Sequence, residues 1–265
     1  MTRMVVPVPT LAPQTMAADL NYPDLIQWRA ALYALYPDLP LPKYFLASEI
    51  RQLAALPLNQ HHRMLMLTLF NTGARINELL DVTPDRIQST PLSLTTAHGI
   101  ETYTLNSIKL RTLKQQRRGK PGTGSKDSFR LVKLYDPEFV RDLKSYIVTH
   151  GKNDRLPLFR NHEKSHDVRI NPETGRRRRN DKALSDQTAR NWLSSIEDVA
   201  RANGLVLPIA LTPRSLRHSC AIHLMLNGLS EKQIALHLGH KSLKSTRVYT
   251  DLLSMDALTV RPIAF

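Results

Sequence analysis

The sequence contains a single cysteine, Cys220, among 265 residues, and this scarcity limits what the chain can be. One thiol cannot form an internal disulfide or supply the paired cysteines of a zinc finger, which excludes a disulfide-stabilised secreted domain. Long apolar runs are missing as well, because no segment approaches the roughly 20 residues that a membrane-spanning helix needs. Pro7, Pro9 and Pro13 interrupt the N-terminal stretch where a secretory signal would be continuous. We therefore expect a cytoplasmic protein with no membrane partner.

Acidic residues are also few relative to basic ones. Asp and Glu number 23 against 37 for Lys and Arg, so the formal charge at pH 7 is +14. The hydrophobic share of 42% is large enough to form a core, which argues against a disordered chain. A folded protein with excess positive charge most often binds the phosphate backbone of a nucleic acid, and less often an anionic membrane or an acidic protein. The charge favours a nucleic-acid partner without saying what is done to it.

The chain divides into an N-terminal arm, a main domain and a short tail. Residues 1–40 form the arm, where prolines leave room for one short helix after Pro23. Residues 41–253 form the main domain, and residues 254–265 form a tail that offers a contact to a neighbouring copy. Apolar residues recur at helical spacing in the arm, and we expect them to pack on the main domain: they are Leu25, Trp28, Leu32 and Leu35.

The main domain is predicted to be mainly α-helical with a small antiparallel β-sheet. Helical periodicity and capping residues indicate helices near 48–56, 61–71, 74–80, 137–147, 185–199, 213–226 and 230–238, and a last one around residue 249. We expect Ser48, Ser185, Thr212 and Ser230 to be caps. The sheet is expected between Thr95 and Leu134, with strands at 102–113 and 129–134 joined by a basic hairpin loop.

Two basic loops are expected to contact nucleic-acid phosphates. One is the hairpin loop, and the other is the segment before the helix at 185–199, which contains four consecutive arginines. Consecutive arginines in a loop suit phosphate binding more than the reading of bases. The predicted DNA-binding residues are Arg117, Arg118, Lys120, Arg176, Arg177, Arg178 and Arg179.

Three polar segments interrupt the helical pattern, at residues 72–79, 212–219 and 238–249. They contain an arginine followed by a glutamate, then an Arg-His pair, then Leu-Gly-His with a tyrosine nine residues after the histidine. Each segment alone is a weak signal, but the combination is specific. Its order and spacing resemble the catalytic domain of the tyrosine recombinases, the integrase family, over about residues 41–253. Full-length relatives carry a separate helical domain before the catalytic one, and the two form a clamp around DNA. Either the arm is a reduced N-terminal helical segment of that clamp, or a partner or the basic loops replace it.

The resemblance implies that Tyr249 is a nucleophile. A tyrosine that attacks phosphorus forms a 3′-phosphotyrosyl bond, which keeps the energy of the phosphodiester for later resealing. The family needs no metal, ATP or other cofactor for this step. Charge on the non-bridging oxygens is neutralised by fixed guanidinium groups, which remain charged and donate paired hydrogen bonds. The matching residues are Arg75 and Arg217, and Glu78 falls at an acidic position that orients a guanidinium.

The leaving 5′-oxygen needs a proton, which the family supplies from a lysine on the hairpin. Lys114 is the residue we assign as general acid, with Lys120 and Lys126 as alternatives in the same loop. His240 matches a family histidine that donates to a phosphate oxygen or places the tyrosine. His218 directly follows Arg217 and is expected to have a structural role.

One position departs from the family pattern. Most relatives carry histidine three residues before the second arginine, whereas this chain has Arg214. Arginine cannot act as a general base, so the acceptor of the Tyr249 proton is left open between water and a neighbouring group. Arg214 is expected to hold a phosphate.

The resulting expectation is a site-specific DNA recombinase similar to short plasmid-borne or fimbrial-switch members of the family. Its partner is double-stranded DNA at specific sites, with a homo-tetramer on DNA and a monomer or dimer when free. Two other functions stay open. A type IB topoisomerase uses similar chemistry to relax supercoils, and a non-catalytic DNA-binding regulator would keep the fold without turnover. Neither the target site nor the outcome, whether integration, inversion or multimer resolution, follows from the sequence.

Overall fold

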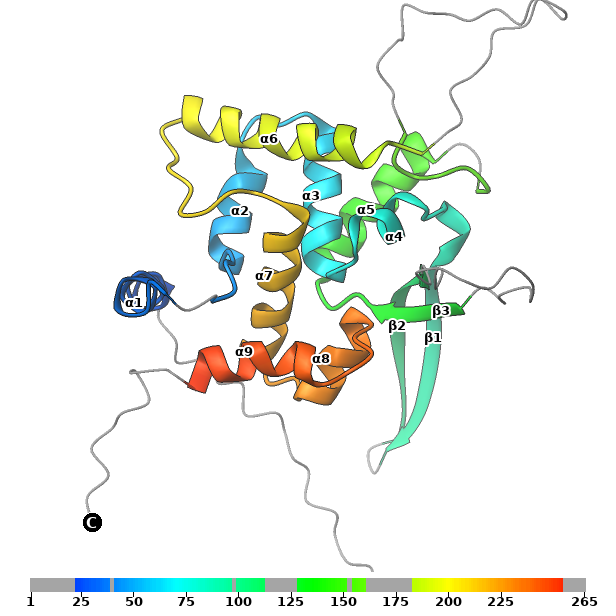
Figure 1. Ribbon diagram of the computed structural model, residues 1–265. Coiled ribbons are helices and arrows are strands. Elements are labelled where there is room, and N and C mark those ends of the chain that lie inside the picture. Colours follow the sequence, from blue (N-terminus) through cyan, green and yellow to red (C-terminus); the bar gives the residue numbers. More distant parts are fainter. Residues whose placement is uncertain are drawn as a thin grey trace, which may run out of the picture.

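The computed structural model describes residues 22–38, 41–96, 99–112, 128–151, 154–160 and 183–254. They form a mainly helical domain with one antiparallel sheet, as the sequence predicts (Figure 1). The helices are α1 (Tyr22–Leu35), α2 (Ala47–Ala55), α3 (Gln60–Thr72), α4 (Ile76–Leu80), α5 (Pro137–His150), α6 (Asp186–Ala202), α7 (Pro213–Leu226), α8 (Glu231–Leu238) and α9 (Lys244–Ser254). The strands are β1 (Ile87–Thr96), β2 (Gly99–Thr112) and β3 (Ser128–Lys133), and a 3₁₀ turn, η2, spans Pro84–Arg86.

Capping side chains begin most of the later helices. Ser185, Thr212 and Ser230 accept hydrogen bonds from backbone N–H groups of the first turns of α6, α7 and α8, which confirms these three caps. The prediction for Ser48 is wrong, because α2 begins one residue earlier and Ser48 lies inside its first turn. Glu49 does the capping there, since its carboxylate accepts the backbone N–H of Leu46 at 2.7 Å.

Helix α7 lies in the middle of the molecule, packed against α3 and close to α8 (Figure 1). The larger apolar cluster joins α2–α6 to the inner face of the sheet. A second cluster joins α7, α8 and α9 to α1, and it includes Leu25, Leu32 and Tyr249. The arm helix is therefore packed on the main domain, as expected for Leu25 and Leu32. Leu35 is 70% exposed because it is the last residue of α1, and the side chain of Trp28 lies outside what the structure describes.

A buried ion pair fastens α1 to the domain. Arg29 is 3% exposed and donates to both carboxylate oxygens of Glu49, at 2.6 and 2.7 Å, and to the carbonyl oxygen of Tyr44 at 3.1 Å. Because Glu49 also caps α2, one carboxylate joins the arm helix to the start of the next helix.

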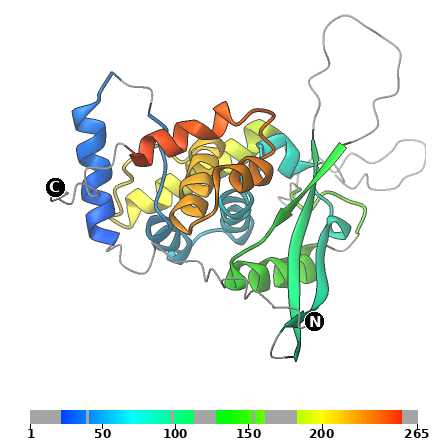
Figure 2. The ribbon, with the colours of Figure 1, turned by 90° about the horizontal axis from the view of Figure 1, so that it is seen from below.

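The sheet has the order β1-β2-β3 and is longer than the sequence indicates. Strand β1 was not predicted, and the expected start of the sheet at Thr95 lies near the end of that strand. β1 pairs with β2 from Ile87 opposite Ile108 to Thr96 opposite Gly99. Most of this ribbon extends away from the helices, at the end of the molecule opposite α1 (Figure 2). Exposed strands need no alternation of apolar and polar residues, which is why the pattern did not reveal β1.

No helix within the described ranges combines the length and the apolar composition required to cross a membrane.

Candidate active site

Glycine turns bring the polar segments together. Gly73 ends α3 with a left-handed φ of 56°, and Gly239 ends α8 with φ of 68°. A Cβ atom at Gly73 would lie 2.4 Å from Cδ2 of Leu238 and 3.1 Å from Sγ of Cys220. Only glycine lets the end of α3 approach α7 and α8 this closely. Arg75, two residues after Gly73, and His240, directly after Gly239, therefore belong to adjoining turns.

Arg217, on α7, joins these two turns. Its Nη1 donates to the carbonyl oxygen of Gly73 at 2.5 Å, and its Nη2 donates to that of Leu238 at 2.8 Å. Burial and the neighbouring Arg75 and Arg130 lower the pKa of Arg217 to about 10. The guanidinium remains charged at neutral pH, so the two turns hold a fixed cation between them.

Arg75 lies just before α4 and faces solvent. Its side chain is 52% exposed, while that of Glu78 is 1% exposed, and Arg75 Nη1 donates to Glu78 Oε1 at 2.9 Å. The backbone N–H of Arg75 donates to the other carboxylate oxygen at 3.1 Å. Glu78 thus orients the arginine, as the sequence predicts for this position, and leaves much of the guanidinium open to an incoming anion.

Arg130, a residue that the sequence did not single out, completes this network from β3. Its Nη1 donates to Glu78 Oε2 at 2.7 Å, and its Nε donates to the carbonyl oxygen of His237 at 3.2 Å. Burial would raise the pKa of Glu78, but Arg130 and Arg75 outweigh it and the pKa is lowered. The alternation of side chains along β3 could have singled out Arg130. Successive residues of a strand point to opposite faces, and Arg130 shares the inward face with the buried Val132.

Arg130 also touches the turn that carries His240. A Cβ atom at Gly239 would lie 2.9 Å from Cδ of Arg130 and 3.0 Å from its Nε. The arginine packs directly against the backbone at Gly239 on one side and holds Glu78 on the other. It therefore links the supports of Arg75 and His240.

Tyr249, on α9, lies between two histidines. The ring of His240 stacks on the phenol with centroids 6.5 Å apart and an interplanar angle of 14°. The edge of His218 approaches with centroids 5.6 Å apart, and its Nδ1 lies 2.9 Å from the Tyr249 hydroxyl. His240 is itself fixed by Thr246, whose Oγ1 lies 2.7 Å from His240 Nδ1.

The electrostatics keep all three rings neutral in this state. Burial, with a smaller contribution from nearby arginines, lowers the pKa of both His218 and His240 to about 4. Burial raises the pKa of Tyr249 to about 12, although Arg217 and Arg214 act to lower it. Tyr249 is only 2% exposed. The hydroxyl is covered and protonated, held in place by His218.

Arg214 occupies the position where the family resemblance leads us to expect a histidine. It is exposed, and its Nε donates to Nε2 of His218 at 3.3 Å. From the sequence, His218 was expected to be structural and Arg214 to hold a phosphate. The structure adds contacts that neither expectation included, because it places the two side chains in one chain of hydrogen bonds that ends at Tyr249.

The predicted general acid and the predicted phosphate-binding residues lie outside the described residues and stay predictions. These are Lys114, with its alternatives Lys120 and Lys126, and Arg117, Arg118, Arg176, Arg177, Arg178 and Arg179. Strand β2 ends at Thr112, opposite Ser128 at the start of β3. In the part of the chain that the structure covers, no group of three or more His, Cys, Asp or Glu residues is arranged to hold a metal ion.

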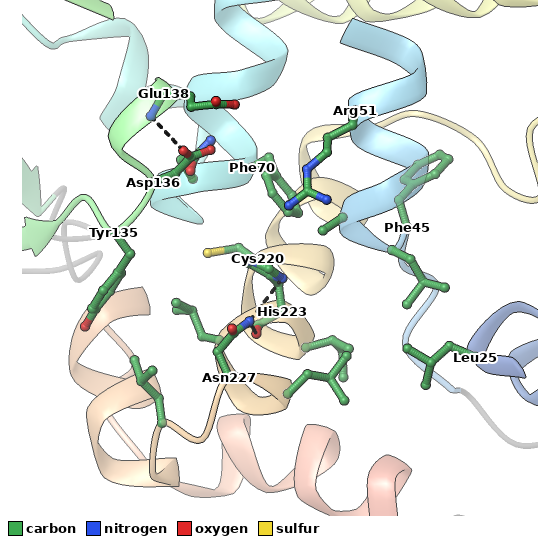
Figure 3. Close-up of a pocket in the computed structure, with 17 residues that line it drawn as sticks. Leu25, Phe45, Arg51, Phe70, Tyr135, Asp136, Glu138, Cys220, His223 and Asn227 are labelled. Carbon is green, nitrogen blue, oxygen red and sulfur yellow. Dashed lines mark hydrogen bonds between the residues drawn. The ribbon is translucent and has the colours of Figure 1, made fainter. Parts of the chain in front are cut away.

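A separate cavity of about 450 Å³ lies on another face of α7 (Figure 3). Arg51, Asp136 and His223 are among its lining residues, whereas Tyr249, Arg75 and Arg217 are not. His240, Arg214 and His218 are absent from its lining as well. The candidate site is therefore the set of turns around Arg217 and not this cavity.

Comparison with known proteins finds a matching family model and several similar proteins. The sequence model of the "Phage integrase family" matches residues 130–255, which begin at Arg130 and include Arg217, His240 and Tyr249. A protein from Escherichia coli named "Resolvase" is 32% identical over 262 residues, which are 96% of this chain and 92% of that protein. Another from Escherichia coli, "Probable site-specific recombinase in afa region", is 30% identical over 84% of this chain and 76% of its own length.

Two solved structures share the fold at low sequence identity. XerA recombinase has a TM-score of 0.53 and 21% identity over 85% of this chain and 66% of its own. The XerH site-specific recombinase bound to difH substrate has a TM-score of 0.53 and 20% identity. That match covers 83% of this chain, which spans about half (53%) of the XerH chain.

Proposed function

Because the chain belongs to the phage integrase family of tyrosine recombinases, we propose that it is a site-specific DNA recombinase that works through a 3′-phosphotyrosyl intermediate. The observation that carries the proposal is the position of Arg217. It bridges the turn before Arg75 and the turn before His240, and the ring of His240 stacks on Tyr249. One partly buried cation thus joins the turns that lead to Arg75 and His240.

The proposed step exchanges one phosphoester bond for another. The Tyr249 oxygen attacks phosphorus, the bond from phosphorus to the 5′-oxygen breaks, and Lys114 gives that oxygen a proton. Arg75 and Arg217 neutralise the non-bridging oxygens. Attack by a 5′-hydroxyl of another strand reverses the step and releases Tyr249. Since the bond energy is retained, the proposal requires no ATP, and the protein groups supply the catalysis without a metal cofactor.

Cleavage requires the Tyr249 hydroxyl to be uncovered. The phenol is 2% exposed, and Leu252 on the same helix is 1% exposed, so the described state is a resting one in which α9 covers the nucleophile. The segment before α9, residues 241–243, is exposed. We propose that binding of DNA opens the cover over Tyr249, so that a phosphate held by Arg75 and Arg217 reaches the hydroxyl while its contact with His218 is kept.

The proposed partners are double-stranded DNA at specific sites and further copies of the chain. Two copies on each of two sites would form a tetramer on DNA, with a monomer or dimer as the free species, and the reaction would take place in the cytoplasm. The relative named "Resolvase" suggests the resolution of joined DNA molecules as the outcome. The C-terminal segment 254–265 is proposed to contact a neighbouring copy. Removal of residues 254–265 should therefore weaken assembly on DNA. Unchanged assembly would show that the contact does not exist.

A nicked duplex tests the proposal once the target site is known. The site is first selected from a random DNA library by binding to the protein. A nick just downstream of the cleavage position lets the short fragment diffuse away, so that a covalent adduct accumulates. Wild type should form an adduct that Tyr249→Phe does not form, while both bind the site equally.

The alternative functions give different results in the same system. A type IB topoisomerase relaxes a supercoiled plasmid without making recombinants between two sites. A non-catalytic regulator binds the selected site but yields no adduct with either the wild type or Tyr249→Phe.

A further inference from the structure

We propose that His218 is a catalytic residue of this reaction, and that it acts as a hydrogen-bond donor to the Tyr249 oxygen in a tautomer set by Arg214. This inference rests on the proposed function. It assigns a role to Arg214, the position where the chain departs from the family pattern. It also gives His218 a role other than accepting a proton.

The three groups form a continuous chain. Arg214 and His218 lie four residues apart on α7, so their side chains share one face of the helix. Arg214 Nε donates to His218 Nε2 at 3.3 Å, and His218 Nδ1 lies 2.9 Å from the Tyr249 hydroxyl. Each imidazole nitrogen therefore has one partner.

The chemistry of arginine decides which nitrogen carries the proton. A guanidinium can only donate, so Nε2 of His218 must be the acceptor. A neutral imidazole has one N–H, which is then on Nδ1 and points at the Tyr249 oxygen. The ring is neutral because burial, Arg214 and Arg217 all lower its pKa, to about 4.

This arrangement is unsuited to a general base. A base at Nδ1 would need a free lone pair there, and taking up a proton would create an imidazolium beside Arg214 and Arg217. Both arginines oppose that charge. The same arginines favour a negative charge on the tyrosine oxygen, because both act to lower the pKa of Tyr249.

The contribution of His218 follows from these charges. As Tyr249 ionises, the Nδ1–H bond to its oxygen becomes charge-assisted and strengthens, while Arg214 polarises the ring from the other side. His218 keeps its proton throughout. The tyrosine proton leaves from the other side of the oxygen to water, and the departing 5′-oxygen gains one from the general acid, so the proton count balances.

Two substitutions separate a donor from a base because they have opposite effects. In His218→Asn the amide can donate from about the position of Nδ1 but cannot take up a proton. In His218→Asp the carboxylate can accept but cannot donate, and its charge opposes a phenolate. We expect the rate of single-turnover adduct formation on the nicked duplex to fall about 100-fold in His218→Ala. The rate of His218→Asn should be at least about tenfold higher than that of His218→Ala. The rate of His218→Asp should be no higher than that of His218→Ala.

The leaving-group side of the reaction provides an independent check. A 5′-bridging sulfur in the nicked duplex leaves as a thiolate and needs no proton. Such a substrate should rescue a variant that lacks the general acid, Lys114→Ala, and should not rescue His218→Ala, because His218 acts on the nucleophile. His223→Asn is the matched control, since His223 also lies on α7 but lines the separate cavity. Its cleavage rate should equal that of wild type.

The outcomes distinguish this inference from the proposed function. If wild type forms no adduct on its selected site, the recombinase proposal fails. If wild type forms the adduct but His218→Ala is equally fast, or if His218→Asp recovers while His218→Asn does not, the donor role is overturned. Band-shift assays and thermal melts of each variant ensure that loss of binding or of folding is not mistaken for loss of the step.

Discussion

Arg130 donates a 2.7 Å hydrogen bond to the carboxylate of Glu78 in a place where the two side chains are 10% and 1% exposed. This buried pair lies beneath Arg75 and against the turn of His240. Because the pair connects β3 with α4 across 52 positions in the sequence, it joins the sheet to the turns that hold Arg75 and His240.

Substitution of Arg130 should destabilise the protein strongly. Arg130→Gln leaves the Glu78 carboxylate buried without a full counter-charge, which typically costs about 3–5 kcal/mol. Urea denaturation measures the change in the free energy of unfolding. The matched control is Arg201→Gln, which breaks a pair between side chains that are 78% and 68% exposed and should change stability by less than about 1 kcal/mol. Equal losses in the two variants would show that the buried pair is not a special support.

Arg75 and Arg217, the two arginines proposed to bind the phosphate, should behave differently in the same measurements. Arg75 is 52% exposed, so we expect Arg75→Ala to keep the free energy of unfolding within about 1 kcal/mol of wild type. Its adduct formation should still fall about 1,000-fold, because a cation at the phosphate is lost.

Arg217→Lys should lose both activity and stability. A single ammonium cannot reproduce the planar pair of donors that reaches Gly73 and Leu238. We expect a loss of about 1–3 kcal/mol in unfolding free energy, together with slow cleavage. A stable but inactive Arg217→Lys would mean that the bridge contributes only to the chemistry.

The helices and the three polar segments were predictable because their signals are local. Ser185, Thr212 and Ser230 precede helical periodicity, and glycine ends α3 and α8, so boundaries follow from a few neighbouring residues. Local signals also placed Arg75, Arg217 and Tyr249 on short elements whose spacing matches a known family. The fold class followed from the same evidence.

The features that the sequence did not reveal depend on distant contacts. Strand β1 lacks the alternation of a half-buried strand, because residues 88–93 on it are exposed. Arg130 reads as one more surface cation until its partner Glu78 is known. The contact of His218 with Tyr249 joins residues that are 31 positions apart on different helices. No pattern within the sequence of α7 predicts this contact.

Gly73→Ala should destabilise more than an ordinary left-handed glycine does. Gly228 has a φ of 81° and nothing within 4 Å of the place that a Cβ would occupy, so Gly228→Ala measures the backbone penalty alone, about 1 kcal/mol. At Gly73 the new methyl group would also overlap Leu238, at 2.4 Å. We expect a total of about 2–4 kcal/mol by urea denaturation.

The same substitution should also impair cleavage, because the Gly73 carbonyl anchors Arg217. Gly228→Ala should leave cleavage unchanged, since Gly228 lies in the turn after α7, away from these contacts. Should Gly73→Ala cleave as fast as Gly228→Ala, the anchoring of Arg217 at Gly73 would be irrelevant to the reaction.

His237 should make stability fall as the pH is lowered from neutral. It is 5% exposed, and burial together with Arg130 lowers its pKa to about 4, against about 6.5 in an unfolded chain. Between these values the unfolded state binds the proton and the folded state does not, so the stabilisation is complete above pH 6.5 and is lost as the pH falls towards 4. For His237 alone the loss from pH 7.5 to pH 5 is about 2 kcal/mol.

Denaturation curves at several pH values test this, with His237→Gln as the comparison. The variant should lack about 2 kcal/mol of the wild-type pH dependence, while its residual slope comes from His218, His223 and His240, whose pKa values are also lowered. Glu78 contributes little in this range, because the stabilisation from its lowered pKa is present above the unfolded value of 4.5 and is lost only as the pH falls below it. An identical slope in wild type and His237→Gln would mean that His237 takes up a proton as readily in the folded protein as in the unfolded chain. The Arg130 guanidinium beside it would then have to move away.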